Sequence, residues 1–210
     1  MKVNLGSGPR HVEGWVEFDK SPSLLLSKVR VIRSWLRAVD LISENQIVDW
    51  DPRIKYKNAL RVSLGKGSVQ YFYISHLLEH LYRDDAERLL DNIFEMLTAG
   101  GIIRICSPDY DLILDEYLSS KDDSPLTSAD RLEDRLLSHP SSKPRGFTRV
   151  SRVLSGHTHY WHPFRTQVLK MLENSGFSQC NFLEFRQGEL PDLHLIETRE
   201  SHSFYIEAKK

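Results

Sequence analysis

The stretch KVNLGSG at residues 2–8 decides the fold class of this chain. Its first residues alternate between apolar and polar side chains, as in a short β-strand, and they run directly into Gly6 and Gly8. Two glycines at this point permit a tight turn and a bare backbone against which a ligand can lie. The third glycine of the dinucleotide fingerprint is absent because His11 stands at its position.

A second strand is predicted at residues 15–18 (WVEF), and it ends in Asp19. This acidic residue stands where a carboxylate at the end of a second strand can bind ribose hydroxyls. The connection between the two strands is too short for a full crossover helix. The two strands together predict a parallel α/β sheet with a ligand site at its carboxyl edge.

Composition indicates one soluble globular domain covering residues 1–210. The chain is 40% hydrophobic and 27% charged, and its formal charge of −1 argues against a general nucleic-acid partner. Cys106 and Cys180 lie far apart inside apolar runs, which predicts free thiols in a reducing compartment. No apolar run is long enough for a membrane span and no signal peptide is recognisable, so we expect a cytoplasmic location.

Residues 24–42 carry apolar side chains at close to a 3.6-residue period and predict one long helix. Its other face holds Lys28, Arg30, Arg33 and Arg37. We interpret this helix as a cover of the sheet with a solvated basic face. Contact with an anionic membrane surface is the alternative, which we do not favour.

The third strand is predicted at residues 46–50 and ends before Asp51, which then lies on the same sheet edge as Gly6 and Asp19. Residues 69–74 (VQYFYI) are rich in aromatic and β-branched side chains and predict the central strand. A helix with a capping box is predicted to begin at Asp84 and to stop at Gly100. A further strand at residues 102–106 follows it.

Apolar periodicity fades between residues 121 and 155, which predicts an insertion or lid without a core of its own. A helix is then predicted from Pro163, with Gly176 at its end. Two closing strands are expected at residues 182–185 and 203–208.

Six segments of the chain resemble the class I S-adenosylmethionine-dependent methyltransferases, most closely the bacterial type-11-like branch often encoded with polysaccharide and other surface-glycan genes. They are residues 2–8, GWVEFD at 14–19, SHLLEHL at 75–81, AGGIIRICSPD at 99–109, HYW at 159–161 and LENSGF at 172–177. The resemblance implies a Rossmann-like, mostly parallel sheet of seven strands in the order 3-2-1-4-5-7-6, with strand 7 antiparallel and helices on both faces. It also implies S-adenosylmethionine as the cofactor.

The resemblance places this cofactor across the carboxyl ends of the first four strands. Gly6 to Gly8 would contact its methionine part, Asp19 the ribose hydroxyls and Asp51 the adenine. The full set of expected cofactor residues is Asn4, Gly6, Ser7, Gly8, Asp19, Asp51, Ser75 and His76. The chain departs from the family at Asn4, where Asp or Glu is common, and in the missing helix after the glycine turn.

Methyl transfer from a sulfonium is an in-line displacement, and a hydroxyl acceptor must also lose a proton. Histidine suits the proton acceptor because its ordinary pKa is about 6.5. The resemblance points His76, at the end of the central strand, toward the transferred methyl group. The other candidate bases are His157, His159, His162 and, as a carboxylate, Asp109.

Two histidine patterns could hold a metal ion. Residues 76–80 (HLLEH) match H-x-x-E-H, in which two histidines one helical turn apart bind zinc. We interpret this segment as a strand end and a turn in which Glu79 and His80 fix the following helix. The spacing of His157, His159 and His162 also suits a metal, but we favour a polar acceptor site there and expect no metal.

No acidic residue occurs between Asp134 and Glu173, although the segment is rich in basic residues. We interpret this bias as a positive wall for an anionic acceptor, and a solvated loop as the alternative. The expected acceptor residues are Arg145, Arg149, His157, His159, Tyr160 and Trp161. The predicted function is O-methylation of a sugar, nucleotide sugar or glycan end. The alternatives are a cofactor-binding subunit without catalysis and a zinc-dependent hydrolase.

Overall fold

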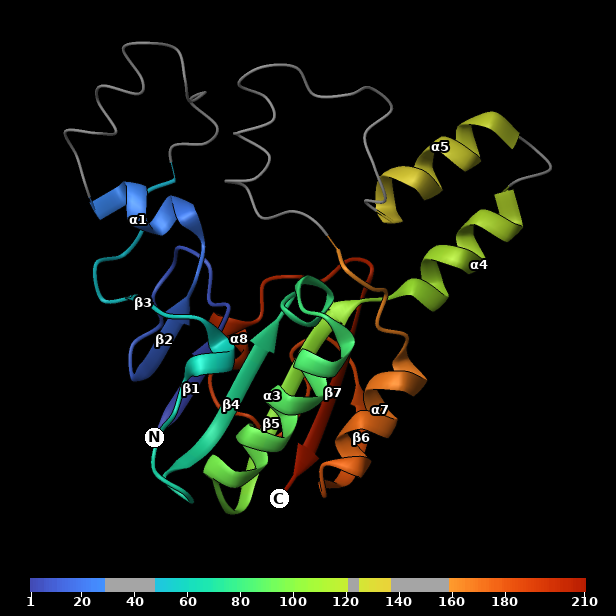
Figure 1. Cartoon of the computed structure of the whole chain (residues 1–210). Helices are drawn as coiled ribbons and strands as arrows, with labels where there is room; N and C mark the ends of the chain where they lie inside the picture. Colours follow the sequence, from blue (N-terminus) through green and yellow to red (C-terminus); the bar gives the residue numbers. More distant parts are fainter. Residues whose placement is uncertain (29–47, 121–124, 137–158) are drawn as a thin grey trace, which may run out of the picture.

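A seven-stranded sheet in the order β3-β2-β1-β4-β5-β7-β6 forms the centre of the protein (Figure 1). The structure is a computed structural model that describes residues 1–28, 48–120, 125–136 and 159–210. Strands β1 to β5 run parallel, and β7 is antiparallel to both β5 and β6, which confirms the predicted sheet. The strands are β1 (Lys2–Leu5), β2 (Trp15–Asp19), β3 (Lys55–Tyr56), β4 (Val69–Ser75), β5 (Leu97–Pro108), β6 (Ser178–Leu183) and β7 (Ser203–Lys209).

Helices lie on both faces of this sheet, with α3 and α7 on one face and α8 behind the other (Figure 1). The helices are α1 (Pro22–Lys28), α3 (Arg83–Met96), α4 (Tyr110–Ser120), α5 (Pro125–Leu136), α7 (Arg165–Asn174) and α8 (Leu193–Ile196), with short 3-10 helices η2 (Ala59–Arg61) and η3 (Leu78–His80). None of the helices in the described ranges combines the length and apolar character that a bilayer crossing needs.

Two apolar clusters hold the layers together. On the α3 and α7 face, strand residues such as Leu5 and Phe72 pack against Leu90 and Leu172. On the opposite face, the cluster of Trp15, Tyr73, Ile102, Cys106, Leu190, Leu193, Ile196 and Tyr205 joins the sheet to the segment around α8. Residues 6–14, all of them described, form no helix between β1 and β2, so the segment around α8 covers part of the face that a crossover helix would cover.

A buried polar row crosses the α8 face of the sheet from strand to strand. Asn4 is the register partner of Glu17 on one side and of Tyr73 on the other, and the row continues through Arg104 to Glu207. All five side chains are buried. Sequence analysis did not find this row, because single polar residues inside strands give no periodic signal.

Arg104 is the anchor of this face. Its guanidinium donates to Glu197 at 2.7 and 2.9 Å, to Glu207 at 3.3 Å, and to the carbonyl oxygens of Gln187 and Glu184 at 2.7 and 3.0 Å. A fully buried guanidinium is tolerated only when its donors and its charge are matched in this way. Arg104 therefore ties the segment between β6 and β7 to the sheet.

Three predicted elements differ from the structure. Residues 48–50 form no strand, and β3 is the two-residue strand Lys55–Tyr56 instead. Helix α3 begins at Arg83 after the N-cap residue Tyr82, which makes no side-chain capping bond, so the predicted capping box is wrong. Strand β5 already begins at Leu97, so Gly100 lies inside a strand rather than ending a helix.

The remaining predictions agree in part. Helix α1 covers the start of the predicted 24–42 helix, and the rest of that prediction lies outside the described residues. Helix α5 falls inside the predicted lid and packs beside α4, whereas residues 137–158 are not described. Strand β6 begins at Ser178, four residues earlier than predicted.

Candidate functional site

The glycine turn after β1 presents its backbone at the carboxyl edge of the sheet. The amides of Gly6 and Ser7 donate to the Phe18 carbonyl oxygen at 2.8 and 3.3 Å, which holds the turn against the end of β2. Gly6 and Gly8 have φ angles of +71° and +68°, a region that favours glycine. A Cβ atom at Gly8 would meet no described atom within 4 Å. The turn therefore leaves room for a ligand directly above Gly8.

The same turn lies beside the segment that follows β4. A Cβ atom at Gly6 would come within 3.3 Å of the Cβ atom of Leu77. Leu77, which follows His76, is thus a neighbour of the glycine turn, although about 70 residues separate the two segments in the chain. This close approach explains why the first position of the turn must be glycine.

Asp19 fastens the end of β2 to the glycine turn. One of its carboxylate oxygens accepts a hydrogen bond from the Gly8 amide at 3.0 Å, and the other accepts one from the Ser21 amide at 2.6 Å. Burial raises the pKa of Asp19, against these backbone hydrogen bonds, which lower it. Each carboxylate oxygen can accept more than one hydrogen bond, so Asp19 retains capacity for ligand hydroxyls.

The buried carboxylate below the glycine turn belongs to Glu17 on β2, whereas β1 carries the uncharged Asn4 at the paired position. The Glu17 carboxylate accepts a hydrogen bond from the Val12 amide at 3.2 Å and lies 2.6 Å from Nδ1 of His11. Burial raises the pKa of Glu17, whereas His11, Val12 and Asn4 lower it. The amide oxygen of Asn4 is buried and has no hydrogen-bond partner among the described residues. The sequence did not point to Glu17, because its pairing with Asn4 depends on the register of the two strands.

Asp51 does not end the third strand, so that prediction is wrong. It precedes β3, and its carboxylate accepts hydrogen bonds from the Arg53 guanidinium at 2.9 and 2.7 Å, which holds the pKa of Asp51 well below its usual range. Its amide still donates to the Pro9 carbonyl oxygen at 3.1 Å, so Asp51 does lie beside the glycine turn. The polar side chain that follows β3 is Asn58, which accepts a hydrogen bond from the Leu60 amide at 3.1 Å.

His76 directly follows Ser75, the last residue of β4. Its amide donates to the Cys106 carbonyl oxygen at 2.9 Å, and its Nε2 lies 3.1 Å from the Ser203 hydroxyl oxygen. Its φ angle is +48°, a left-handed conformation that is unfavourable for residues other than glycine. Such strain persists only where the surroundings impose it, and it is concentrated at functional positions.

The turn after His76 does not have the geometry of an H-x-x-E-H zinc helix. That motif needs both histidines on one helical turn. Here His76 is left-handed, Leu77 caps the turn, and only Glu79 and His80 lie in η3. The zinc-dependent hydrolase considered above therefore lacks its ligand arrangement.

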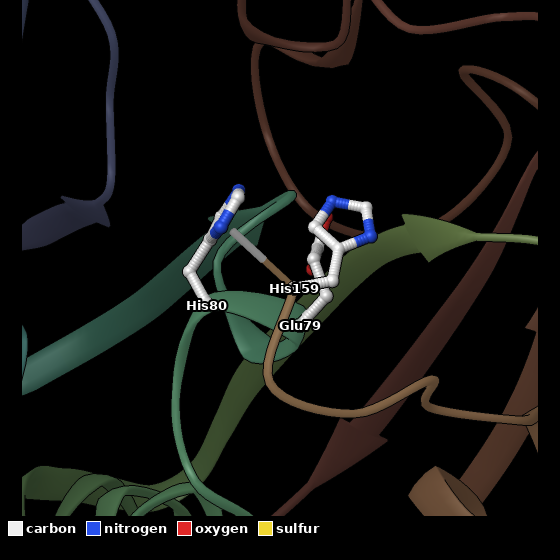
Figure 2. Close-up of side chains that lie close together, drawn as sticks. All are labelled: Glu79, His80 and His159. Atoms are coloured by element: carbon white, nitrogen blue, oxygen red, sulfur yellow. The ribbon is translucent and has the colours of Figure 1, made fainter. Parts of the chain in front are cut away.

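His159 is brought to this turn from the far end of the chain. The Tyr160 amide donates to the Glu79 carbonyl oxygen at 2.8 Å, and Nδ1 of His159 lies 3.0 Å from the Tyr110 hydroxyl oxygen. Burial lowers the pKa of His159 to about 4. The His80 and His159 rings meet edge to face, with centroids 5.0 Å apart (Figure 2).

The Trp161 side chain is fixed against the core of the protein. Its indole nitrogen donates to the Leu78 carbonyl oxygen at 2.8 Å, and its ring packs against the core. Tyr160 is instead half exposed, and its ring lies 4.6 Å from that of Tyr82. Of the two aromatic residues expected to stack on the methyl acceptor, Tyr160 is the more exposed.

Asp109 forms an ion pair with Arg165. It is buried at the end of β5, where the Arg165 side chain donates to both of its oxygens and the Leu112 amide approaches one of them at 3.3 Å. Asp109 therefore joins the starts of α4 and α7 to the end of β5.

The structure thus brings seven of the predicted site residues to or near one edge of the sheet: Gly6, Ser7, Gly8, Asp19, Ser75, His76 and His159. Arg145, Arg149 and His157 lie outside the described residues. His162 is near the site, with its Nε2 3.1 Å from the Leu136 carbonyl oxygen.

The order of the strands, the antiparallel last strand and the glycine turn after β1 define the fold of the class I S-adenosylmethionine-dependent methyltransferases. Solved structures confirm this fold. A methyltransferase from Mesorhizobium loti described as S-adenosylmethionine-dependent has a TM-score of 0.52 and 16% identity, with 100% of this chain and 90% of that chain covered. One from Methanosarcina mazei has a TM-score of 0.51 and 15% identity, with 100% and 91% covered.

A protein from Pyrococcus horikoshii OT3 has the same fold, with a TM-score of 0.53, 12% identity and 99% of this chain and 80% of that chain covered. No family model matches the chain, and no curated protein matches its sequence. The comparisons therefore show the fold, and the activity has to be argued from the site.

Proposed function

We propose that this protein is an S-adenosylmethionine-dependent methyltransferase that methylates a hydroxyl group of a small polar acceptor, such as a sugar, nucleotide sugar or glycan end. The observation that carries the proposal is the open glycine turn at Gly8, whose amide is bonded to Asp19 at the end of the neighbouring strand. In a sheet of this topology, ligands bind at the carboxyl ends of the strands, where the strand order reverses.

The residues present fit this cofactor. Above Gly8, bare backbone borders open space that suits its methionine part. Asp19 has lone pairs for ribose hydroxyls, and Asn58, which follows β3, is our candidate for the adenine contact that the resemblance assigned to Asp51. The unpaired amide oxygen of Asn4, with Glu17 beside it, supplies acceptors below the turn.

When bound, the cofactor supplies an electrophilic methyl group for in-line displacement. The chain must then orient the acceptor and remove its proton. We assign the proton acceptor to His76, because it directly follows β4 and precedes Leu77, which contacts the glycine turn. His159 is the second candidate, but burial lowers its pKa to about 4, which keeps it neutral at pH 7 and makes it a weak proton acceptor.

For the acceptor, the charge bias of the segment between Asp134 and Glu173 supports an anionic compound. Tyr160 offers an exposed ring on which a sugar or base can stack. Arg145, Arg149 and His157 complete the proposed acceptor set. An anionic sugar or nucleotide sugar also fits the surface-polysaccharide context that the sequence resemblance suggests.

The two cysteines support the proposed cytoplasmic location. Both are free thiols, and Cys106 is buried. Free thiols are typical of reducing compartments.

A second candidate is a subunit of the same fold that binds the cofactor without catalysis. Two observations favour it: Asn4 stands where a carboxylate is common, and residues 6–14 form no helix. Both candidates bind the cofactor, but only the first transfers its methyl group.

The test of the proposal is a calorimetric titration with S-adenosylmethionine of the wild type and of Gly8→Asn. Asparagine tolerates a positive φ angle, so this variant keeps the backbone and fills the ligand space. Gly100→Asn is the matched control, because Gly100 also has a positive φ angle, +72°, and open space around it, but lies far from the site. We expect binding to be lost in Gly8→Asn alone.

If the wild type does not bind the cofactor, or if Gly8→Asn binds it equally well, the proposal is wrong. A wild type that binds tightly but transfers no methyl group to any sugar or nucleotide-sugar hydroxyl supports the second candidate.

A further inference from the structure

Glu79 is a buried carboxylate without a hydrogen-bond donor. Its side chain is fully buried in η3, and neither carboxylate oxygen has a hydrogen-bond partner among the described residues. Nδ1 of His76 lies 3.3 Å from one of these oxygens, but without the geometry of a hydrogen bond. A buried carboxylate is costly unless a cation or donors compensate it. The position of Glu79 therefore calls for a positive partner.

Two imidazoles converge on this carboxylate. Glu79, His80 and His159 each offer a ligand atom, and these atoms lie within 4.8 Å of one another. Figure 2 shows the three side chains converging, two from η3 and one from the segment that precedes α7. Such spacing needs only small side-chain movements to surround one ion at the usual distances of about 2.0–2.2 Å.

Contacts with neighbouring residues also hold the cluster of Glu79, His80 and His159 in place. The Tyr110 hydroxyl lies 3.0 Å from Nδ1 of His159, which leaves Nε2 of that ring for a ligand. Tyr160 and Trp161 bond to the carbonyl oxygens of Glu79 and Leu78, so the two segments that carry the cluster are fixed to each other. Metal-binding histidines characteristically have such outer contacts, which orient the ring.

We propose that Glu79, His80 and His159 bind one divalent first-row transition ion. Two imidazoles and one carboxylate form a ligand set that suits zinc, iron and similar ions, and three protein ligands leave a coordination position open. The proposal differs from both histidine patterns in the sequence, since it uses neither His76 nor His157. Sequence spacing could not reveal it, because 79 residues separate His80 from His159.

The role of the ion rests on the proposed function, whereas its binding does not. The open coordination position would take the acceptor hydroxyl, whose acidity a bound cation raises. A hydroxyl prepared in this way loses its proton more readily to a base such as His76.

The test is to strip the full-length protein with a chelator and titrate it with Zn²⁺ by calorimetry, without S-adenosylmethionine, and with Co²⁺ by visible absorption. We expect one equivalent to bind, with the absorption bands of protein-bound Co²⁺. Glu79→Gln and His159→Gln should each weaken binding at least about tenfold. His194→Gln, at an exposed histidine of α8, is the control and should bind like the wild type.

Circular dichroism and thermal unfolding establish that each variant is folded, and His159→Gln provides the test if Glu79→Gln does not fold. Equal binding by the wild type, Glu79→Gln and His159→Gln would overturn the proposal. So would loss of binding in His157→Gln and His162→Gln when Glu79→Gln and His159→Gln still bind, because the ion would then lie elsewhere.

Titration of the same proteins with S-adenosylmethionine separates this inference from the proposed function. A protein that binds the cofactor but no metal ion refutes only the metal site. One that binds the metal ion but no cofactor refutes only the methyltransferase.

Discussion

Asn4 and Glu17 are register partners on β1 and β2, and Glu17 supplies the only carboxylate of this pair. Glu17 is buried, and it binds the part of the β1–β2 connection that contains His11 and Val12. The neighbouring strand thus supplies an acidic group below the glycine turn. We expect Glu17 and Asn4 to act together in the cofactor site.

Glu17→Ala should therefore weaken both the fold and the cofactor site. It leaves the Val12 amide and the His11 ring without their buried partner, which costs about 1–3 kcal/mol of unfolding free energy. We expect affinity for S-adenosylmethionine to fall by about tenfold, equivalent to about 1.4 kcal/mol. Urea unfolding and calorimetric titration measure the two effects. Glu13→Ala, at an exposed residue of the same connection, should change neither.

His76 can be tested with substitutions that respect its backbone. His76→Asn removes the imidazole but tolerates the positive φ angle, so the fold should be retained. If His76 accepts the proton of the acceptor, kcat should fall by about 10² to 10⁴. The measurements are the turnover of the variant with the acceptor that the wild type methylates and the thermal stability of the variant. Undiminished turnover in a folded variant would show that His76 is not the proton acceptor.

Arg104 should be among the most sensitive positions for stability. Arg104→Ala leaves the buried Glu197 and Glu207 without their cation, and breaking a buried ion pair in this way costs about 3–5 kcal/mol. Urea unfolding measures this loss. Arg88→Ala, which removes an exposed pair with Asp85 on α3, should change stability by no more than about 1 kcal/mol. Similar losses in the two variants would contradict the anchoring role.

Asp192 gives a pH-dependent contribution to stability. Its hydrogen bonds from Lys2 and Trp15 lower its pKa below the ordinary value of 3.8. A carboxylate with a lowered pKa in the folded state stabilises the fold above its ordinary pKa, and the contribution is lost as the pH falls through the folded pKa. Asp192→Asn should therefore be less stable than the wild type at pH 6, and the difference should shrink below about pH 3.8. A difference in unfolding free energy that does not change with pH would contradict this.

Strands β1, β2, β4 and β5 could be predicted because each is a short run rich in apolar, aromatic or β-branched side chains, with glycine, aspartate or serine at its end. Strand β3 could not, since a two-residue edge strand with exposed Lys55 and Tyr56 has no apolar pattern, whereas the apolar run at residues 46–50 resembles one. Gly100 was misread for a related reason. A positive φ angle suits the end of a helix, but it occurs here inside β5.

The candidate site was predictable where neighbouring residues form it and unpredictable where distant ones meet. Gly8 and Asp19 are 11 residues apart, and the strand-turn-strand pattern places both. The pairing of Asp109 with Arg165 and the approach of His159 to Glu79 join segments separated by more than 50 residues. Such contacts depend on tertiary packing, which cannot be predicted from the local sequence pattern.

The cover that α8 and its flanking segment give to the sheet has a consequence for folding. Asp192 bonds to Lys2 and Trp15 across 190 and 177 residues, and Arg104 bonds to Glu197 across 93. Contacts of such long range form late, because the loops that they close carry a high entropic cost. The layer behind the glycine turn can therefore pack only after these long loops have closed. We expect the ligand site between β1 and β2 to be completed late in folding, after the strands themselves have paired.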